Sequence, residues 1–332
     1  MIRVAMLSFW HVHARDYARQ ATEHPGVQIV AAWDEDPARG REQAAELNVP
    51  FQEDLDQLLK DPDIDGVIVD APTNIHPQVI TAAARAGKHI FTEKVLALTI
   101  ADAQDIVAAV KQAGVGLVLS LPRLYDGYTQ AITKVLAGGE LGDITLVRAR
   151  LSHNGAVAGW LPAHFFDPTP CGGGAMVDLG CHPMYLTRLF AGLPDSVQAS
   201  YGNITGRAVE DNAVAVLRYP NGRLGVVEAG FANRHSPFTI EVHGTEGSLL
   251  YGTPEPKLLV RAGEATDWSE VPIPDNVPSA FDQWVEHIEA GTWAEDNVAI
   301  GLDLTRLMEA ANISAKNGES VALSTLPGGQ HS

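Results

Sequence analysis

Over roughly the first 120 residues, short apolar runs alternate with segments whose apolar positions have helical spacing. Strands that alternate with helices of roughly ten residues are typical of βαβ units and a parallel sheet. We therefore predict an α/β, doubly wound domain at residues 1–121. The expected strands are residues 4–7, 27–33, 66–69, 88–91 and 115–120, and the expected helices are residues 14–24, 37–47, 76–86 and 99–113.

The pattern changes near residues 121–123, after which longer segments alternate apolar and polar positions. Pro220-Asn221-Gly222, between two of these segments, is a hairpin signal. We predict an α+β second domain at residues 122–325 with a large, mostly antiparallel open sheet, followed by a disordered tail at 326–332. Its expected strands are residues 144–153, 197–203, 213–219, 224–231 and 239–243, and its helices are residues 126–137, 174–190, 279–290 and 297–316.

The net charge of −18, from 23 basic and 41 acidic side chains, excludes the basic face that a duplex nucleic-acid binder needs. The two cysteines, Cys171 and Cys181, are too few for a disulfide framework, which indicates a reducing compartment. The apolar runs are too short to span a bilayer, and the chain begins with a strand-like run rather than a signal peptide. We expect a cytoplasmic enzyme that acts on a small molecule.

The turn after the first strand departs from the Gly-x-Gly-x-x-Gly pattern that lets a backbone approach a dinucleotide. Ser8, Trp10 and His13 occupy the three glycine positions, and the indole should crowd a pyrophosphate or displace it. Asp34 follows about 20 residues later, where an acidic residue binds the ribose 2′-hydroxyl. Glu35 beside it would repel a 2′-phosphate, so NAD is preferred over NADP. The alternative is that Asp34 is only a strand-end turn residue.

His11 and His13 form a two-residue spacing that a metal site could use. The sequence shows no third ligand nearby, so we interpret them as a helix-start histidine and a partner on the helix surface. No metal is expected.

Two polar segments carry the candidate chemistry. Lys94 follows an apolar strand, at the edge where open α/β sheets bind ligands. Asp178 and His182 are four residues apart, on one face of a helix that starts at Gly172-Gly173-Gly174. A lysine, a carboxylate and an imidazole in one interdomain cleft could move a proton of a substrate hydroxyl. Individually, they could be a solvated lysine, a helix cap and a core histidine.

Four segments give the chain a family resemblance: residues 71–76, 86–94 and 172–182, and Gly142-Asp143-Ile144. Together they resemble the glucose–fructose oxidoreductase / inositol dehydrogenase / MocA family of NAD(P)-dependent oxidoreductases. The resemblance implies a Rossmann domain, a mixed second domain whose open sheet often forms the oligomer interface, and hydride transfer between NAD(P) and a secondary hydroxyl of a sugar or polyol. Two features depart from the family pattern: Val95 replaces the proline after the lysine, and the first turn lacks glycines.

The resemblance also implies roles for individual residues. Lys94 matches the lysine of the family's Glu-Lys-Pro motif, and Asp178 and His182 match its aspartate and histidine. We expect His182 to act as acid/base, Lys94 to stabilise the developing alkoxide, and Asp178 to orient the site. The remaining assignments are cofactor contacts by Ser8, Trp10, His11, Val12, Asp34, Ala71, Thr73, Asn74, His76, Glu93, Lys94 and Arg123, and substrate contacts by Lys94, Arg123, His153, Trp160, Asp178, His182 and Tyr185.

Some of these residues have a plain structural alternative: an interdomain salt bridge for Arg123, and packing for Trp160 and Tyr185. Three other functions stay open: a glycosidase that uses NAD without net turnover, a catalytically idle binding or regulatory protein, and a metal-dependent hydrolase built on His11 and His13. The sequence does not name the sugar or polyol or the direction of the reaction. An open-faced sheet predicts a homodimer or homotetramer.

Overall fold

The computed structural model describes residues 1–253 and 255–328, and its contacts divide the chain into two compact units. Unit 1 comprises Met1–Leu121 and Pro278–Leu302, and unit 2 comprises Pro122–Val277 and Asp303–Ser332. Residues 278–302, which we expected in the second domain, thus belong to unit 1. The tail also differs, because Leu326 is buried and its N–H donates to the Leu323 carbonyl (3.2 Å); residues 329–332 of the expected tail lie outside the described residues.

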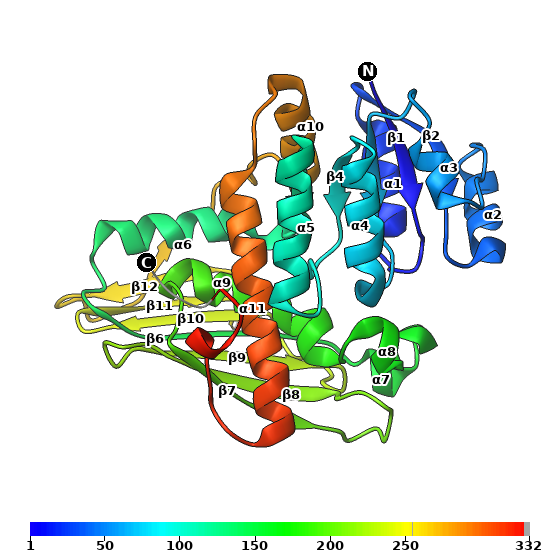
Figure 1. The fold of residues 1–332 in the computed structure, drawn as a ribbon. Helices are drawn as coiled ribbons and strands as arrows, with labels where there is room; N and C mark the ends of the chain where they lie inside the picture. The colour runs from blue at the N-terminus through cyan, green and yellow to red at the C-terminus, as the bar shows by residue number, and fades with distance from the viewer. Residues whose placement is uncertain (254, 329–332) are drawn as a thin grey trace. The chain divides into compact units, whose positions relative to one another are not determined.

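Unit 1 contains a parallel five-stranded sheet with the order β2-β1-β3-β4-β5, which confirms the doubly wound fold (Figure 1). The central strand β3 is buried at every position, as expected for a parallel strand covered on both faces. The strands are β1 (Ile2–Leu7), β2 (Val27–Trp33), β3 (Gly66–Val69), β4 (His89–Thr92) and β5 (Leu117–Leu119), and the helices are α1 (Ala14–Glu23), α2 (Pro37–Glu46), α3 (Leu55–Leu59), α4 (His76–Arg85), α5 (Ile100–Ala113) and α10 (Ala280–Ala290).

Aromatic packing explains why the late segment belongs to unit 1. The ring centroid of Phe91 in β4 lies 5.4 Å from that of Phe281 and 5.9 Å from that of Trp284, both in α10. Trp284 is fully buried, and Tyr17 from α1 completes the cluster against Phe91 at 5.1 Å. Each such ring buries about 150–250 Å², so α10 supplies a large part of the apolar surface under β4.

Asn297 closes the edge of the parallel sheet. It lies in α11 (Glu295–Asn317), whose first residues belong to unit 1 and whose later residues belong to unit 2. Its side-chain oxygen accepts from the Leu119 N–H (2.8 Å), and its side-chain NH₂ donates to the Leu119 carbonyl (3.0 Å). The amide therefore pairs with both backbone groups of an edge strand, as a further strand would.

Unit 2 contains a nine-stranded sheet with the order β13-β12-β11-β10-β6-β9-β8-β7-β14. Only the central β6–β9 pair is parallel, and the hairpin predicted at 220–222 joins β8 to β9. Strands β11 to β14 were not predicted, since they are short and lie toward the sheet edges. The strands are β6 (Ile144–Ser152), β7 (Ser196–Gly202), β8 (Asn212–Arg218), β9 (Leu224–Gly230), β10 (Thr239–Gly244), β11 (Gly247–Tyr251), β12 (Leu258–Ala262), β13 (Ser269–Val271) and β14 (Val321–Ala322).

Helices cover one face of this sheet. Helix α9 (Cys181–Ala191) packs on β6 and β9, and α11 packs on β7, where the Ala199 N–H donates to Ser314 Oγ (2.9 Å) (Figure 1). The opposite face carries the partly exposed Arg148, Glu228 and Val214. The remaining helices of unit 2 are α6 (Gly127–Gly138), α7 (Gly155–Ala158), α8 (Pro168–Cys171) and the π-helix Met176–Gly180. In the described ranges, no helix is both long and apolar enough to cross a membrane.

We predict that Asn297→Ala lowers the free energy of unfolding by at least about 2 kcal/mol, because it leaves two buried backbone groups unpaired and each costs about 1–3 kcal/mol. Urea unfolding together with hydrogen exchange of the β5 amides measures the effect. Asn317→Ala is the matched control, since Asn317 is exposed on the same helix. Equal unfolding midpoints for the two variants would contradict the edge-closing role.

Candidate active site

Lys94 lies directly after the carboxyl end of β4 in unit 1, and its side chain is only 3% exposed. The Glu93 N–H donates to the Val69 carbonyl (2.9 Å), which extends the pairing of β4 with β3 to the residue before the lysine. Lys94 Nζ lies 3.9 Å from Glu93 Oε1. The Lys94–Val95 peptide bond is cis. A buried ammonium group with a carboxylate beside it therefore stands at the ligand-binding edge of the sheet.

His76 is hydrogen-bonded to the backbone of the loop that follows Lys94. Its Nε2 lies 2.9 Å from the Ala71 carbonyl and its Nδ1 lies 3.0 Å from the Val95 carbonyl, so the imidazole links the loops after β3 and β4. Burial lowers the pKa of His76, and it has no exposed surface. The imidazole therefore positions these two loops, and its cofactor contact stays a prediction. Of its predicted neighbours in the segment after β3, Thr73 is buried and Asn74 is exposed.

Several polar side chains contact the Glu93 carboxylate. His13 Nδ1 lies 3.1 Å and His11 Nδ1 3.9 Å from its Oε2, and the Tyr17 hydroxyl donates to the same oxygen. Burial opposes ionisation of Glu93, but the neighbouring His11, His13 and Lys94 hold its pKa well below the ordinary value. The statement that His11 and His13 have no third ligand nearby is thus wrong. The sequence did not indicate Glu93 as this third ligand, because Glu93 follows a different strand from the two histidines. The predicted cofactor contact of Glu93 is unsupported, since the residue is only 2% exposed.

Asp70 was not predicted at all. It follows β3, is fully buried, and neither carboxylate oxygen has a hydrogen-bond partner among the residues that the structure describes. Its carbonyl accepts from the His11 N–H (3.2 Å). Burial, and then the charge of Glu93, raise the pKa of Asp70 well above its usual range. Its place right after a buried strand was the only signal that the sequence offered.

The loop after β1 retains part of the dinucleotide-binding geometry. Ser8 has φ 76°, the left-handed conformation that a glycine adopts without cost, and its Oγ accepts from the Trp10 N–H (3.2 Å). Trp10 is 8% exposed, so its indole is not displayed on the surface, whereas Val12 is 47% exposed. Helix α1 begins right after this loop and presents its first N–H groups there, as a phosphate-binding helix does. These features fit a bound dinucleotide even without the glycines.

Asp34 is enclosed by donors of its own unit. It is 1% exposed and accepts four hydrogen bonds, from the backbone N–H groups of Phe9 (2.9 Å) and Asp36 (2.7 Å) and from Arg39 Nε (2.9 Å) and Nη2 (2.6 Å). A carboxylate offers about four acceptor positions, so these donors occupy Asp34 in this conformation, and its ribose contact stays a prediction. Glu35, whose side chain is 26% exposed and also pairs with Arg39, is the more accessible carboxylate.

In unit 2, His182 and Tyr185 lie one turn apart on α9. Nδ1 of His182 lies 3.1 Å from the Tyr185 hydroxyl, and that hydroxyl accepts from the Arg123 backbone N–H (3.0 Å). Tyr185 has no exposed surface and contacts His182, so it can position that imidazole, and its substrate contact stays a prediction. The Arg123 guanidinium lies over the Phe238 ring (4.2 Å).

Asp178 lies in the π-helical turn just before α9, so the predicted helix has a wider first turn than expected. Such turns are rare and occur frequently at functional sites. Burial lowers the pKa of His153, while the nearby charge of Asp178 opposes that shift. The ring centroid of Trp160, a residue that is 56% exposed, lies 4.6 Å from that of His153. The structure therefore places these predicted substrate residues together in unit 2.

Glu210, which sequence reasoning missed, fixes the start of the π-helical turn. Its carboxylate accepts from the backbone N–H groups of Gly174 (2.8 Å) and Met176 (3.0 Å). A Cβ on Gly174 would lie 2.1 Å from the Glu210 carbonyl oxygen, so only glycine fits there.

Lys94 belongs to unit 1, whereas Asp178 and His182 belong to unit 2. Their convergence in one cleft stays a prediction.

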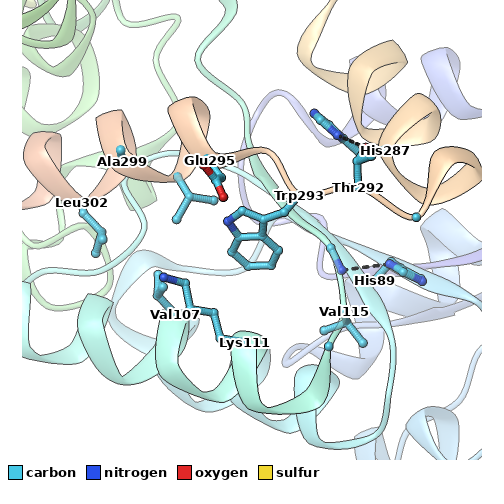
Figure 2. A pocket seen from close by; sticks show the side chains of 14 residues that line it. His89, Val107, Lys111, Val115, His287, Thr292, Trp293, Glu295, Ala299 and Leu302 are labelled. Atoms are coloured by element: carbon cyan, nitrogen blue, oxygen red, sulfur yellow. Dashed lines mark hydrogen bonds between the residues drawn. The ribbon is translucent and has the colours of Figure 1, made fainter.

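A cavity of about 660 Å³ lies elsewhere in unit 1. Figure 2 shows the Trp293 indole in it, between Lys111 and Val107 of α5 and Glu295. His89 at the start of β4 and Gly116 before β5 also line this cavity, which puts it at the amino ends of these strands. It is thus at the opposite end of β4 from Lys94, and we do not assign it to the candidate active site.

Comparison with known proteins bears on both halves of the chain. Residues 3–120 match the model of an oxidoreductase family with an NAD-binding Rossmann fold, and residues 129–250 match the GFO/IDH/MocA C-terminal domain. The chain is 30% identical over 264 residues to scyllo-inositol 2-dehydrogenase (NAD(+)) of Bacillus subtilis, covering 76% of this chain and 74% of that one. It is 29% identical over 302 residues to 1,5-anhydro-D-fructose reductase of Ensifer adhaerens, covering 86% and 89%.

Solved structures agree on the fold. Levoglucosan dehydrogenase in complex with NADH and levoglucosan superposes with a TM-score of 0.80 at 22% identity, covering 97% of this chain and 99% of that one. Aldose–aldose oxidoreductase from Caulobacter crescentus gives 0.81 at 21% identity, with the same coverage. Because family models match both the parallel-sheet unit and the open-sheet unit, and a curated relative reaches 30% identity, the chain belongs to the GFO/IDH/MocA family of oxidoreductases.

Proposed function

We propose that this protein transfers hydride between NAD and a secondary hydroxyl or ketone of a sugar, polyol or inositol-like compound. The observation that carries the proposal is the buried Lys94 at the carboxyl end of β4, in the NAD-binding unit of an oxidoreductase family member. Relatives named for an inositol and an anhydrofructose support the substrate class.

The loop after β1, the amino end of α1, and Thr73 and Asn74 after β3 would hold the dinucleotide. The nicotinamide supplies hydride transfer when bound, and the protein supplies position and proton transfer. Ser8 keeps the glycine-like backbone conformation that this binding mode needs.

Lys94 donates a hydrogen bond to the substrate oxygen and stabilises the negative charge that develops there. The Glu93 carboxylate lies 3.9 Å from its ammonium group and stabilises that charge. His182 accepts the hydroxyl proton at Nε2 during oxidation, in the tautomer whose Nδ1–H faces the Tyr185 oxygen (3.1 Å). Asp178 binds a neighbouring hydroxyl and orients the substrate. In the reverse direction the same imidazole returns the proton to the ketone oxygen.

NAD is preferred over NADP in this proposal. Asp34 and Glu35 place two carboxylates at the end of β2, where a 2′-phosphate would otherwise sit. Arg39 is the cation nearest to them, and it already pairs with both. With Asp34 enclosed, Glu35 is the carboxylate that receives the ribose hydroxyl.

A homo-oligomer forms through the uncovered face of the nine-stranded sheet. At its centre Arg148 pairs with Glu228 (3.0 Å) and lies 3.8 Å from Glu241, and Val214 and Leu224 are 38% and 41% exposed beside them. Apolar side chains around a charged centre can pair with a second copy of the same face. The chain has two cysteines, Cys171 and Cys181, which are too few for a disulfide framework, and this supports a reducing, cytoplasmic location.

We predict that His182→Ala and Lys94→Ala each lower the turnover number about 10²–10⁴-fold while NAD binding persists, because each removes a proton-transfer or charge-stabilising group. NADH formation across a panel of sugars and polyols measures turnover. His235→Ala is the control, since His235 is exposed in a turn. Near-normal turnover in either variant would remove that residue from the mechanism.

We predict that NAD binds at least about tenfold more tightly than NADP, a difference of about 1.4 kcal/mol, and that Glu35→Gln narrows this ratio. Calorimetric titration of both cofactors measures the ratio. Glu53→Gln is the control, because Glu53 is an exposed carboxylate paired with Arg41. Failure of both cofactors to bind would overturn the oxidoreductase proposal and favour an idle binding protein.

We predict that Val214→Glu weakens self-association at least tenfold, because like charges would meet across the paired sheet faces. Analytical ultracentrifugation over a range of concentrations measures the shift. Ile204→Glu adds the same charge at a residue that is 73% exposed and lies outside the sheet strands. A monomeric wild-type protein, or equal shifts in both variants, would contradict this interface.

A further inference from the structure

His11, His13 and Glu93 bring three ligand atoms together in unit 1. One nitrogen of each imidazole and one carboxylate oxygen of Glu93 all lie within 4.8 Å of one another. The bond lengths of a tetrahedral zinc site, about 2.0–2.2 Å, place neighbouring ligand atoms about 3.4 Å apart. The separations here bracket that value: His13 Nδ1 lies 3.1 Å from Glu93 Oε2, in a hydrogen bond that a metal would replace, and His11 Nδ1, which also accepts from the His13 N–H (3.2 Å), lies 3.9 Å from the same oxygen.

Asp70 is a second observation that points to a cation in this region. Its carboxylate is fully buried, and neither oxygen has a hydrogen-bond partner within the described part of the chain. Its backbone lies beside the cluster, because the His11 N–H donates to the Asp70 carbonyl (3.2 Å). An isolated buried carboxylate is costly unless a charge or hydrogen bonds compensate it. A cation bound by Glu93 and the two histidines would lower that cost.

We propose that His11, His13 and Glu93 bind a divalent transition-metal ion. Two imidazoles and a carboxylate suit Zn²⁺, Mn²⁺, Fe²⁺ or Co²⁺, whereas Mg²⁺ and Ca²⁺ prefer oxygen ligands throughout. The site adjoins Lys94 through Glu93 but includes neither Asp178 nor His182, and its test reads metal content rather than turnover.

The groups around the cluster fit this role. The Tyr17 hydroxyl donates to Glu93 and lies 2.6 Å from Ser120 Oγ, so it orients the carboxylate from behind, as partners of metal ligands commonly do. Lys94 opposes a cation, but its Nζ lies on the side of Oε1, whereas both imidazoles approach Oε2.

The site is tested on the purified full-length protein. Elemental analysis after chelator-free purification is expected to find about one transition-metal ion per chain. After EDTA treatment and dialysis, calorimetry with Zn²⁺ and absorption spectroscopy with Co²⁺ should each show one saturable site. Loss of a group behind a metal ligand already costs 10–100-fold in affinity, so His13→Ala, which removes a ligand, should weaken Zn²⁺ binding at least about 100-fold.

His13 is the preferred position because its side chain is 35% exposed and tolerates truncation. His235→Ala removes an exposed imidazole elsewhere and should bind Zn²⁺ as the wild type does. Zn²⁺ should also raise the melting temperature of the wild type and of His235→Ala but not of His13→Ala. Absence of saturable binding, or equal Zn²⁺ affinity in His13→Ala, would overturn the site.

Discussion

A buried negative charge at the carboxyl end of β4 governs the geometry of unit 1. Glu93 has almost no solvent around it, so its ionisation depends on the cations and donors that the fold places there. The loop after β1 contributes His11 and His13, α1 contributes Tyr17, and the next residue contributes Lys94. One carboxylate thus joins segments that lie far apart in the sequence and sets the orientation of the groups that meet the ligand.

The local patterns predicted the fold well. All five parallel strands were found, because strands buried on both faces show as continuous apolar runs and the helices between them carry their own start signals. Asp36 accepts from two N–H groups at the start of α2, and Thr99 accepts from the Asp102 N–H at the start of α5. The strands that were missed lie toward the edges of the second sheet, where a short strand buries too little to leave a pattern.

The site was predicted less completely, because its decisive contacts join distant segments. The sequence identified Lys94, Asp178 and His182 as candidates, but it gave no sign that Asp34 is enclosed by Arg39 or that Glu93 stands beside two histidines. Residues that act through others were also missed: Glu210 holds the turn that carries Asp178, as His76 holds the loop that carries Lys94. Such couplings depend on the register between strands rather than on spacing along the chain.

Because residues 278–302 complete unit 1, the first domain cannot finish folding until late in the synthesis of the chain. Phe281 and Trp284 leave the ribosome roughly 190 residues after Phe91, which at about 5–20 residues per second is a delay of roughly ten to forty seconds. During that interval the sheet lacks the helix that covers β4, and the amide of Asn297 has not yet reached the edge of β5. Until those residues are synthesised, the nascent first domain exposes the aromatic surface around Phe91, which is the kind of surface that chaperones bind.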